Sequence, residues 1–394
     1  MDKMADVLGR AGAWCGQNKY LSAIKNAFQN FMPLTIAGAI GVLWCNVLVN
    51  DQTGLGLFFK PIMALDFLNP AFQAVNFCTI SCITVGITLG IAQEIGVWNM
   101  GAEKAGYIPG LVGLAAWLSV TNTSHMVEGA KEAFTGIAGN ELGATGLFTG
   151  MIIGVLSVEL FCFFEKQDAL KIKMPEQVPP GVARAFEVLV PATITLIITA
   201  CIGSACYNLT GLYLNDVIKN GIQGPLGAVG ATIPGVMIIY LVIMLFWLVG
   251  IHGNNMLSAV KEALFTPLAL ENVEKFNKGE KPTNIINMYA LQMWGEFGGS
   301  GVTIGLVIAI MIFGKREDNK AIATLSLVPG LFNINETVTF GIPMVLNPIL
   351  GIPFVFACLV TILVGYVLTV IGFCPVACLT VPWTCLLYTS DAAD

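Results

Sequence analysis

Long stretches of this chain contain no charged residue, while Lys, Arg, Asp and Glu gather in the segments between them. A helix needs about 20 consecutive apolar residues to cross the hydrocarbon core of a membrane. The backbone must satisfy its own hydrogen bonds there, which favours helices. The pattern therefore predicts several membrane-spanning helices. The charge-free stretches are residues 27–50, 67–93, 188–215, 220–260 and 337–390.

Composition supports the prediction of an all-α, polytopic membrane protein. Hydrophobic residues make up 56% of the 394 positions and charged residues 11%, whereas a soluble domain carries about 25% charged residues. The short alternating segments of a membrane β-barrel are absent from the sequence. The net charge of −6 favours no particular partner, and no basic stripe suggests nucleic acid. The N-terminus is polar, so we expect no signal peptide.

Lys and Arg in the connecting segments predict the orientation of the spans. The N-terminal segment and the loop at 164–187 are both rich in these residues and are separated by four expected spans, so both are expected in the cytoplasm. Two further spans lead to a basic stretch that begins at Lys261 and is expected on the same side. The spans are predicted near residues 27–49, 67–93, 106–124, 142–163, 188–207, 225–250, 301–314 and 351–374.

The alternation fails once, between the stretch that begins at Lys261 and the basic residues Lys315 and Arg316. Little more than one full span lies between them, which would place them on opposite sides. Residues 284–300 form a half-length apolar segment that ends in the glycine-rich run 298–301, and glycine permits a sharp reversal. We therefore predict a re-entrant hairpin that turns near Gly298–Gly301. The alternative is an ordinary helix with a glycine packing face.

The chain is expected to divide into two functional parts and a short foreign tail. Residues 1–210 carry few polar groups in their spans and are expected to form a scaffold. Residues 211–384 carry the costly polar groups and are expected to bind substrate and transport it. Residues 385–394 resemble translated adapter sequence, so we expect this tail to be artefactual and the last helix to be truncated.

Glu336 is the strongest candidate for a functional residue, because a charged group in an apolar stretch is costly. Prolines and glycines on both sides interrupt any continuous helix, and Asn333, Asn335 and Asn347 add amide groups. An unwound stretch with amides and one carboxylate is typical of a midplane transport site. Amides and a carboxylate can together bond the hydroxyls of a sugar. The alternative is a glutamate on an aqueous loop.

His252 is the second candidate, because it follows the charge-free stretch 220–251 and is flanked by Gly250 and Gly253. A neutral imidazole could bond a hydroxyl or pair with Glu336, although a lone histidine is often only a packing group. Trp383, Trp247 and Trp294 could stack on a sugar ring, or could anchor the chain at the membrane interface. Glu296, beside the glycine turn, is a weaker candidate for a polar contact, and His125 is expected to be solvated. The eleven cysteines are interpreted as small apolar residues in helices.

Motifs for soluble catalysis are missing from the sequence. It contains no His-Glu-x-x-His zinc motif and no phosphate-binding loop of the Gly-x-x-x-x-Gly-Lys-Ser/Thr type. It also lacks Gly-x-Ser-x-Gly. An intramembrane enzyme is therefore the weaker hypothesis. A group-translocating sugar permease and an ion-coupled secondary sugar transporter remain the two main alternatives, and no metal or cofactor is expected in either.

Several short segments, taken in order, resemble a known family. They are Pro179–Phe186, Gly250–Gly253, Gly298–Gly301, Phe332–Glu336, Phe340–Pro348 and Val381–Thr384. Together they are similar to the membrane permease (IIC) component of the lactose/cellobiose/diacetylchitobiose family of the sugar phosphotransferase system. The likeness runs from the N-terminal helices to Thr384, after which this chain departs from the family. Two smaller departures are Thr337, where the family usually has Pro, and Gly181, where Asn is common.

The resemblance implies a homodimer of multi-pass subunits with about ten spans in the cytoplasmic membrane of a bacterium. The N-terminus would be cytoplasmic, and the C-terminal half would hold a disaccharide between two re-entrant hairpins. Glu336 and His252 would bond sugar hydroxyls, and Trp383 would pack on a sugar ring. Asn333, Asn335, Gly299 and Glu296 complete the expected site. A phosphocysteine on a separate IIB protein, supplied through IIA, would phosphorylate the sugar, so no cysteine of this chain is the phosphate carrier.

Overall fold

The structure, a computed structural model, divides into two compact units. Unit 1 comprises Met1–Asn18, Ala39–Gln73 and Leu226–Asp394, and unit 2 comprises Lys19–Gly38 and Ala74–Pro225. Helices α2 (Lys19–Leu43) and α3 (Asn69–Asn76) begin in one unit and end in the other. The structure describes residues 6–7, 10, 13–14, 17–51, 55–125, 134–175, 177–225, 230–331, 333–342, 344 and 347–379.

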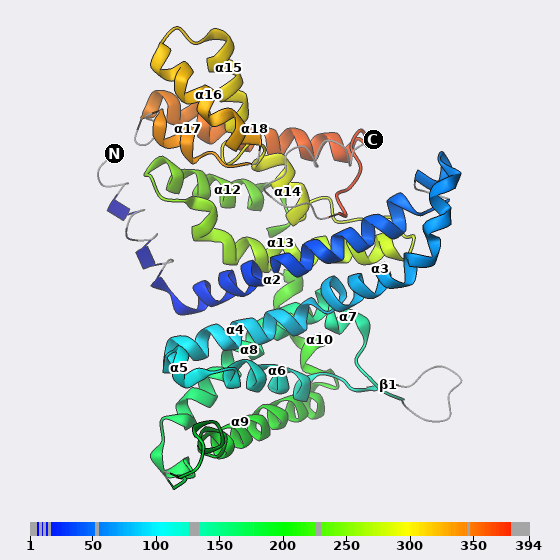
Figure 1. The fold of residues 1–394 in the computed structure, drawn as a ribbon, viewed down its shortest axis with the longest axis vertical. Coiled ribbons are helices and arrows are strands. Elements are labelled where there is room, and N and C mark those ends of the chain that lie inside the picture. Colours follow the sequence, from blue (N-terminus) through cyan, green and yellow to red (C-terminus); the bar gives the residue numbers. More distant parts are fainter. Residues whose placement is uncertain are drawn as a thin grey trace. The chain divides into compact units, whose positions relative to one another are not determined.

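Unit 2 is built around three helices, α4, α6 and α8, which pack on one another, and α9 packs on α6 and α8 (Figure 1). Close approach depends on small residues. A Cβ added at Gly113 of α6 would lie 2.3 Å from the Cβ of Ala92 in α4. The elements are η4 (Phe77–Ser81), α4 (Ile83–Met100), α5 (Ala102–Ala105), α6 (Ile108–Val120), β1 (Ser124–His125), β2 (Phe134–Thr135), α7 (Gly139–Leu142), α8 (Ala144–Glu165), η5 (Asp168–Leu170), α9 (Pro180–Thr210), α10 (Leu214–Ile218) and η6 (Lys219–Gln223).

Unit 1 contains the helices that follow residue 226. Helix α12 packs against α13 and α18, α14 packs against α13 and α18, and α15 folds back on α16 (Figure 1). The elements are η1 (Trp44–Leu48), η2 (Leu55–Leu57), η3 (Lys60–Leu68), α12 (Ile233–Leu248), α13 (Gly253–Asn277), α14 (Met288–Gly295), α15 (Thr303–Phe313), α16 (Glu317–Leu331), α17 (Glu336–Gly341) and α18 (Pro348–Val370).

The prediction of a helical fold with several long apolar helices is confirmed. Among the described residues, four helices are long and apolar enough to cross a membrane: Lys19–Leu48, Thr145–Glu165, Pro180–Thr210 and Ile349–Val370. Three shorter apolar helices, Ile108–Val120, Ile233–Leu248 and Thr303–Phe313, coincide with further predicted spans. Within the described ranges, strands are limited to the antiparallel pair β1 and β2, in which Ser124 pairs with Thr135 and His125 with Phe134.

The helical segment that contains the expected span at 67–93 is bent. Lys60–Ser81 and Ile83–Met100 meet at an angle of 42°, which makes the pair either one broken span or a re-entrant segment. The π-helical turn η4 immediately precedes the bend. A π turn opens the regular hydrogen-bond ladder, and such irregularities are recognised causes of helix kinks. The sequence shows no sign of the bend, because residues 77–82 contain neither Gly nor Pro.

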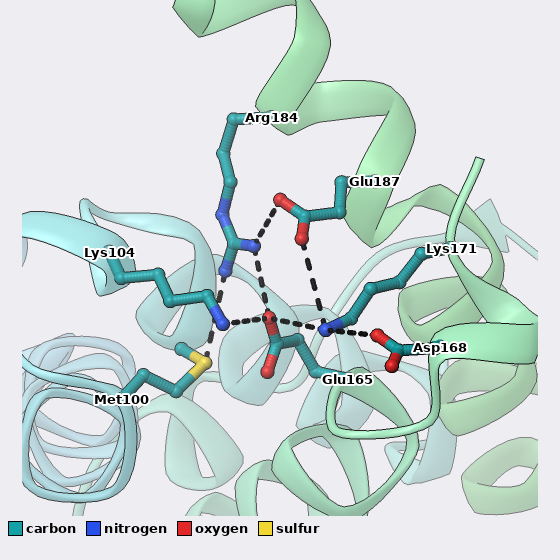
Figure 2. Close-up of polar contacts among 7 residues, drawn as sticks. All are labelled: Met100, Lys104, Glu165, Asp168, Lys171, Arg184 and Glu187. Carbon is teal, nitrogen blue, oxygen red and sulfur yellow. Dashed lines mark hydrogen bonds and ion pairs between the residues drawn. The ribbon is translucent and has the colours of Figure 1, made fainter. Parts of the chain in front are cut away.

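A group of charged residues ties the end of α8 to the start of α9 (Figure 2). The Glu165 side chain is only 2% exposed, and its Oε1 lies 3.0 Å from both Lys104 Nζ and Arg184 Nη1. Arg184 Nη1 also lies 2.8 Å from Glu187 Oε2. Lys171, from the connector between the two helices, lies 3.9 Å from both glutamates. The α4–α6 loop and the α8–α9 connector therefore meet at one end of unit 2.

Lys19 links further segments of unit 2. Its Nζ lies 2.6 Å from Glu159 Oε1 in α8 and donates to Asn99 Oδ1 near the end of α4, at 3.3 Å. Partly buried ion pairs are screened less by salt than fully exposed ones. The start of α2, the end of α4 and the last turns of α8 are thus joined by polar contacts.

Glu141 of α7 is a buried acid in unit 2, with its side chain outside the apolar helices. Its Oε2 is buried and has no hydrogen-bond partner among the described residues. Burial raises the pKa of the Glu141 carboxyl, partly offset by the charge of His125 and a hydrogen bond with Asn215, while Asp216 raises it further. The folded protein therefore takes up a proton at Glu141 more readily than the unfolded chain does.

This shift predicts how stability depends on pH. As the pH falls from 8 through the raised pKa of Glu141, this residue should increase the free energy of unfolding. The increase should be complete at about pH 4.3, the ordinary pKa of glutamate. Glu141→Gln should remove this contribution and raise the thermal midpoint at pH 8, measured by size-exclusion chromatography of heated, detergent-solubilised protein. The exposed Glu103 of α5 provides the control Glu103→Gln. A Glu141→Gln profile parallel to that of the parent chain would refute the assignment.

Candidate functional site

The predicted turn at Gly298–Gly301 separates α14 from α15 and depends on glycine. The φ angles are +71° at Gly298, +94° at Gly299 and +80° at Gly301, a region that side chains rarely adopt. The turn closes through its own backbone, because Gly299 N donates to Glu296 O at 2.9 Å. The helix is therefore interrupted where the sequence predicted, and the alternative of a continuous helix with a glycine face does not apply.

Asn333 and Asn335 hold this turn from the segment between α16 and α17. Gly298 N donates to Asn333 Oδ1 at 2.7 Å, and Asn335 Nδ2 donates to Ser300 O at 2.9 Å. Asn335 is only 3% exposed. A Cβ added at Gly299 would lie 2.5 Å from Asn335 Cβ, so the turn and the amide are in close contact. Three of the predicted site residues, Gly299, Asn333 and Asn335, are thus brought together.

The start of α13 reaches the same turn. His252 is the N-cap residue of α13, and its Nδ1 accepts from Asn255 N at 3.2 Å. A neutral ring in this arrangement carries its proton on Nε2. The ring lies 4.4 Å from the ring of Trp247, centroid to centroid. Two residues after His252, Asn254 Nδ2 donates to Ser300 Oγ at 2.7 Å.

Ser300 is therefore the common contact of two predicted regions. Its hydroxyl accepts from Asn254 at the start of α13, and its carbonyl accepts from Asn335, the N-cap residue of α17. His252 lies two positions before one of these partners, and Glu336 lies one position after the other. The backbone of Glu336 begins α17; its side chain, Trp383 and the tail 385–394 lie outside what the structure describes.

Gly253 fixes the first turn of α13 against α12. A Cβ added at Gly253 would lie 2.0 Å from the carbonyl oxygen of Ile243. Since a backbone atom cannot give way as a flexible side chain can, any larger residue would push the two helices apart. The glycine beside His252 is thus required for packing, in addition to the flexibility that glycine offers.

Lys261 is a residue whose burial the sequence analysis did not predict. It was expected in a cytoplasmic basic stretch, but it lies within α13 and is only 5% exposed. Its Nζ contacts Glu296 Oε1 and donates to Asn254 Oδ1 at 3.2 Å. Seven residues separate Asn254 from Lys261, a spacing that places both on one helix face. Extending the helical period beyond residue 260 would have revealed this buried lysine.

Glu296, the weakest candidate from the sequence, ends α14 as its C-cap residue. Its Oε1 accepts from Tyr240 OH at 3.2 Å as well as from Lys261. Tyr240 belongs to α12 and is 1% exposed. The carboxylate therefore joins three helices at the point where the glycine turn begins.

Asn272, near the end of α13, anchors a second part of unit 1. Its Oδ1 accepts from Thr283 N and Asn284 N, at 3.2 and 3.0 Å. Its Nδ2 donates to Ala377 O at 3.0 Å, and Asn287 Nδ2 donates to the same carbonyl at 3.1 Å. Two buried amides therefore hold the segment that follows α18. The aromatic candidate Trp294 packs elsewhere, since a Cβ added at Gly365 of α18 would lie 2.4 Å from its indole.

A family model described as "Phosphotransferase system, EIIC" matches residues 25–358. The chain belongs to this family. It is 32% identical over 392 residues to the oligo-β-mannoside-specific EIIC component of Bacillus subtilis, covering 98% of this chain and 86% of that protein. It is 28% identical to the cellobiose-specific EIIC component of Lactococcus lactis, covering 96% and 89%.

The solved structure of the transporter ChbC, the IIC component of an N,N′-diacetylchitobiose-specific phosphotransferase system, is also similar. The TM-score is 0.87 at 28% identity, over 97% of this chain and 88% of that one. The sequence-based prediction of a phosphotransferase-system sugar permease is confirmed. Among the described residues, no group of three or more His, Cys, Asp and Glu side chains could hold a metal ion.

The turn geometry makes a prediction about Gly299 in this EIIC chain. Gly299→Ala should destabilise the protein by about 1–3 kcal/mol, because alanine resists a φ of +94° and its Cβ meets Asn335. The thermal midpoint in detergent should fall accordingly. Gly305→Ala is the matched control, since Gly305 lies in α15 with open space around it. Equal midpoints for the two variants would contradict the requirement for glycine in the turn.

Proposed function

We propose that this EIIC chain binds a β-linked disaccharide beside the Gly298–Gly301 turn and carries it across the cytoplasmic membrane of a bacterium. The observation that carries the proposal is the position of Ser300, bonded by Asn254 and Asn335. Asn254 lies two residues after His252, and Asn335 lies one residue before Glu336. The two contacts therefore bring both segments to one turn. The sugars in the names of the similar proteins, oligo-β-mannoside, cellobiose and diacetylchitobiose, support this class of substrate.

Each proposed contact follows from the chemistry of a hydroxyl, which both donates and accepts. The Glu336 carboxylate accepts, and the Nε2–H of His252 donates. Asn333, Asn335 and the backbone at Gly299 shape the turn against which the sugar lies. Trp383 covers an apolar face of a sugar ring. The cost of burying these polar groups is offset only when a hydroxyl-rich guest bonds them.

Phosphorylation completes the proposed transport. A phosphocysteine on a separate IIB protein, itself supplied by IIA, transfers its phosphoryl group to a sugar hydroxyl on the cytoplasmic side. The S–P bond breaks, an O–P bond forms and the hydroxyl proton leaves. In this proposal the chain itself supplies no phosphate-carrying residue. It binds and orients the sugar, and no cofactor takes part.

The proposed topology has about ten spans and a cytoplasmic N-terminus. The contacts Lys19–Glu159 and Lys104–Glu165 support it, because they join segments that the positive-inside rule assigns to one side. The turn at Gly298–Gly301 is the candidate for a re-entrant hairpin of the C-terminal half, and the bent pair at Cys82 is proposed as one broken span. Residues 1–210 are proposed to form the contacts of a homodimer, and residues 211–384 to transport the sugar.

Uptake experiments test the proposed function against an ion-coupled transporter. Right-side-out vesicles that contain the chain and enclose phosphoenolpyruvate with the IIA, IIB and general phosphotransferase proteins should accumulate phosphorylated, radiolabelled cellobiose or diacetylchitobiose. Accumulation should survive an uncoupler, because the phosphoryl donor supplies the free energy. Vesicles without IIB are the control. Uptake that needs no IIB and collapses with the uncoupler would show the ion-coupled alternative to be correct.

Substitution of Glu336 tests the proposed binding site. A hydrogen bond to a charged group contributes about 1.5–3 kcal/mol, so Glu336→Gln should weaken disaccharide binding about 10- to 100-fold, and Glu336→Ala should abolish it. Equilibrium binding of radiolabelled sugar to purified protein measures both. Glu317→Gln is the control, because Glu317 also begins a helix but its side chain is 87% exposed. Parental affinity in Glu336→Ala would remove Glu336 from the site.

A further inference from the structure

The contact between Lys261 and Glu296 is a buried ion pair that joins three helices of unit 1. The two side chains are 6% and 15% exposed. Lys261 belongs to α13, Glu296 caps α14, and Tyr240 of α12 donates to the same carboxylate oxygen. The Lys261 ammonium also lies 5.4 Å from the centre of the Tyr240 ring. The pair therefore lies where α12, α13 and α14 meet.

A second connection runs from the same lysine to the other side of the glycine turn. Lys261 donates to Asn254 Oδ1, and Asn254 Nδ2 donates to Ser300 Oγ. Because the Asn254 oxygen is bonded to the ammonium, its amide nitrogen is oriented toward Ser300. Lys261 is thus linked to the turn at two points. Glu296 connects it to the start of the turn, and Asn254 connects it to Ser300 in the middle of the turn.

Such a pair has little reason to exist for stability alone. Taking two charges out of water is expensive, and replacing a buried pair by apolar residues is often neutral or stabilising, whereas removing one partner is strongly destabilising. A buried ion pair can instead serve to fix one conformation of the segments that it contacts. Here that segment is the turn contacted by Asn333 and Asn335.

We propose that Lys261 and Glu296 are positioning residues that act as a unit: paired, they hold the Gly298–Gly301 turn in the conformation that receives the sugar. Neither charge then serves as a sugar ligand, which replaces the sequence-based role of Glu296 as a direct contact. The Oε1 of Glu296 already accepts from an ammonium and a phenol. This inference rests on the proposed function only where its test measures the binding of a sugar.

A double-mutant cycle tests whether Lys261 and Glu296 act together. Lys261→Met keeps the length of the side chain and removes the charge, and Glu296→Gln keeps an acceptor for Tyr240. Each single variant leaves one buried charge unpaired, so each should weaken binding of radiolabelled cellobiose or diacetylchitobiose about tenfold or more. The double variant removes both charges of the pair and should bind within about threefold of the parent chain. The charge swap Lys261→Glu with Glu296→Lys should also bind better than either single variant.

The matched control uses a surface pair on the same helix. Lys278 Nζ lies 2.7 Å from Glu274 Oε1, with the two side chains 59% and 41% exposed. Lys278→Met and Glu274→Gln should leave sugar binding unchanged, because exposed pairs contribute little.

Hydrogen exchange supplies a readout that needs no sugar. The amides of Gly298, Gly299 and Val302 are bonded within the turn or to Asn333. A peptide covering residues 296–303, followed by mass spectrometry, should exchange faster in both single variants and at the parental rate in the double variant. If both single variants fail to fold while the double variant folds, this result would also show that Lys261 and Glu296 act together.

Two results would overturn the inference. In the first, Glu296→Gln and the double variant both lose sugar binding while Lys261→Met binds normally, which would make Glu296 a sugar ligand. In the second, the double variant exchanges at the turn as fast as the single variants. If the parent chain itself binds no disaccharide, the proposed function fails, and the exchange pattern still decides whether the pair holds the turn.

Discussion

A backbone that leaves a helix among apolar residues loses the partners of its N–H and C=O groups, and the site in unit 1 is organised by how those partners are replaced. At the Gly298–Gly301 turn the replacements are side-chain amides. Asn333 accepts from the N–H of Gly298, and Asn335 donates to the carbonyl of Ser300. Glycine supplies the conformations, and the amides supply the hydrogen bonds that lipid cannot. The turn is therefore held in one conformation by side chains from a separate segment.

The two units differ in how they use polar groups. In unit 2 the central helices approach through small residues and apolar side chains such as Trp117 and Ile153, and the ion pairs gather at one end, around Glu165. In unit 1 the ion pair Lys261–Glu296 and several amides lie between the helices themselves. The polar contacts described in unit 1 thus lie between helices, whereas the ion pairs of unit 2 lie near helix ends.

The sequence was informative where one residue type has one physical meaning. Charge-free stretches marked the apolar helices, and a glycine cluster marked the turn. Asn333 and Asn335 were singled out because they stand in a stretch broken by Pro and Gly, and the structure places both against the turn. The bend at Cys82 was missed because a π turn has no such signature. The burial of Lys261 was missed because a lysine after an apolar run usually marks a membrane edge, and its partner Glu296 lies 35 residues away in the chain.

The spacing of residues along α13 has a mechanical consequence. Asn254, Lys261 and Asn272 are separated by seven and eleven residues, so an α-helix places them within about 20° of one another on a single face. The first two contact the glycine turn, and the third holds the carbonyl of Ala377, in the segment that leads to Trp383. Rolling α13 about its axis would strain all three contacts at once. The glycine turn and the segment after α18 are therefore held by the same face of one helix, and a rotation of α13 would have to displace both together.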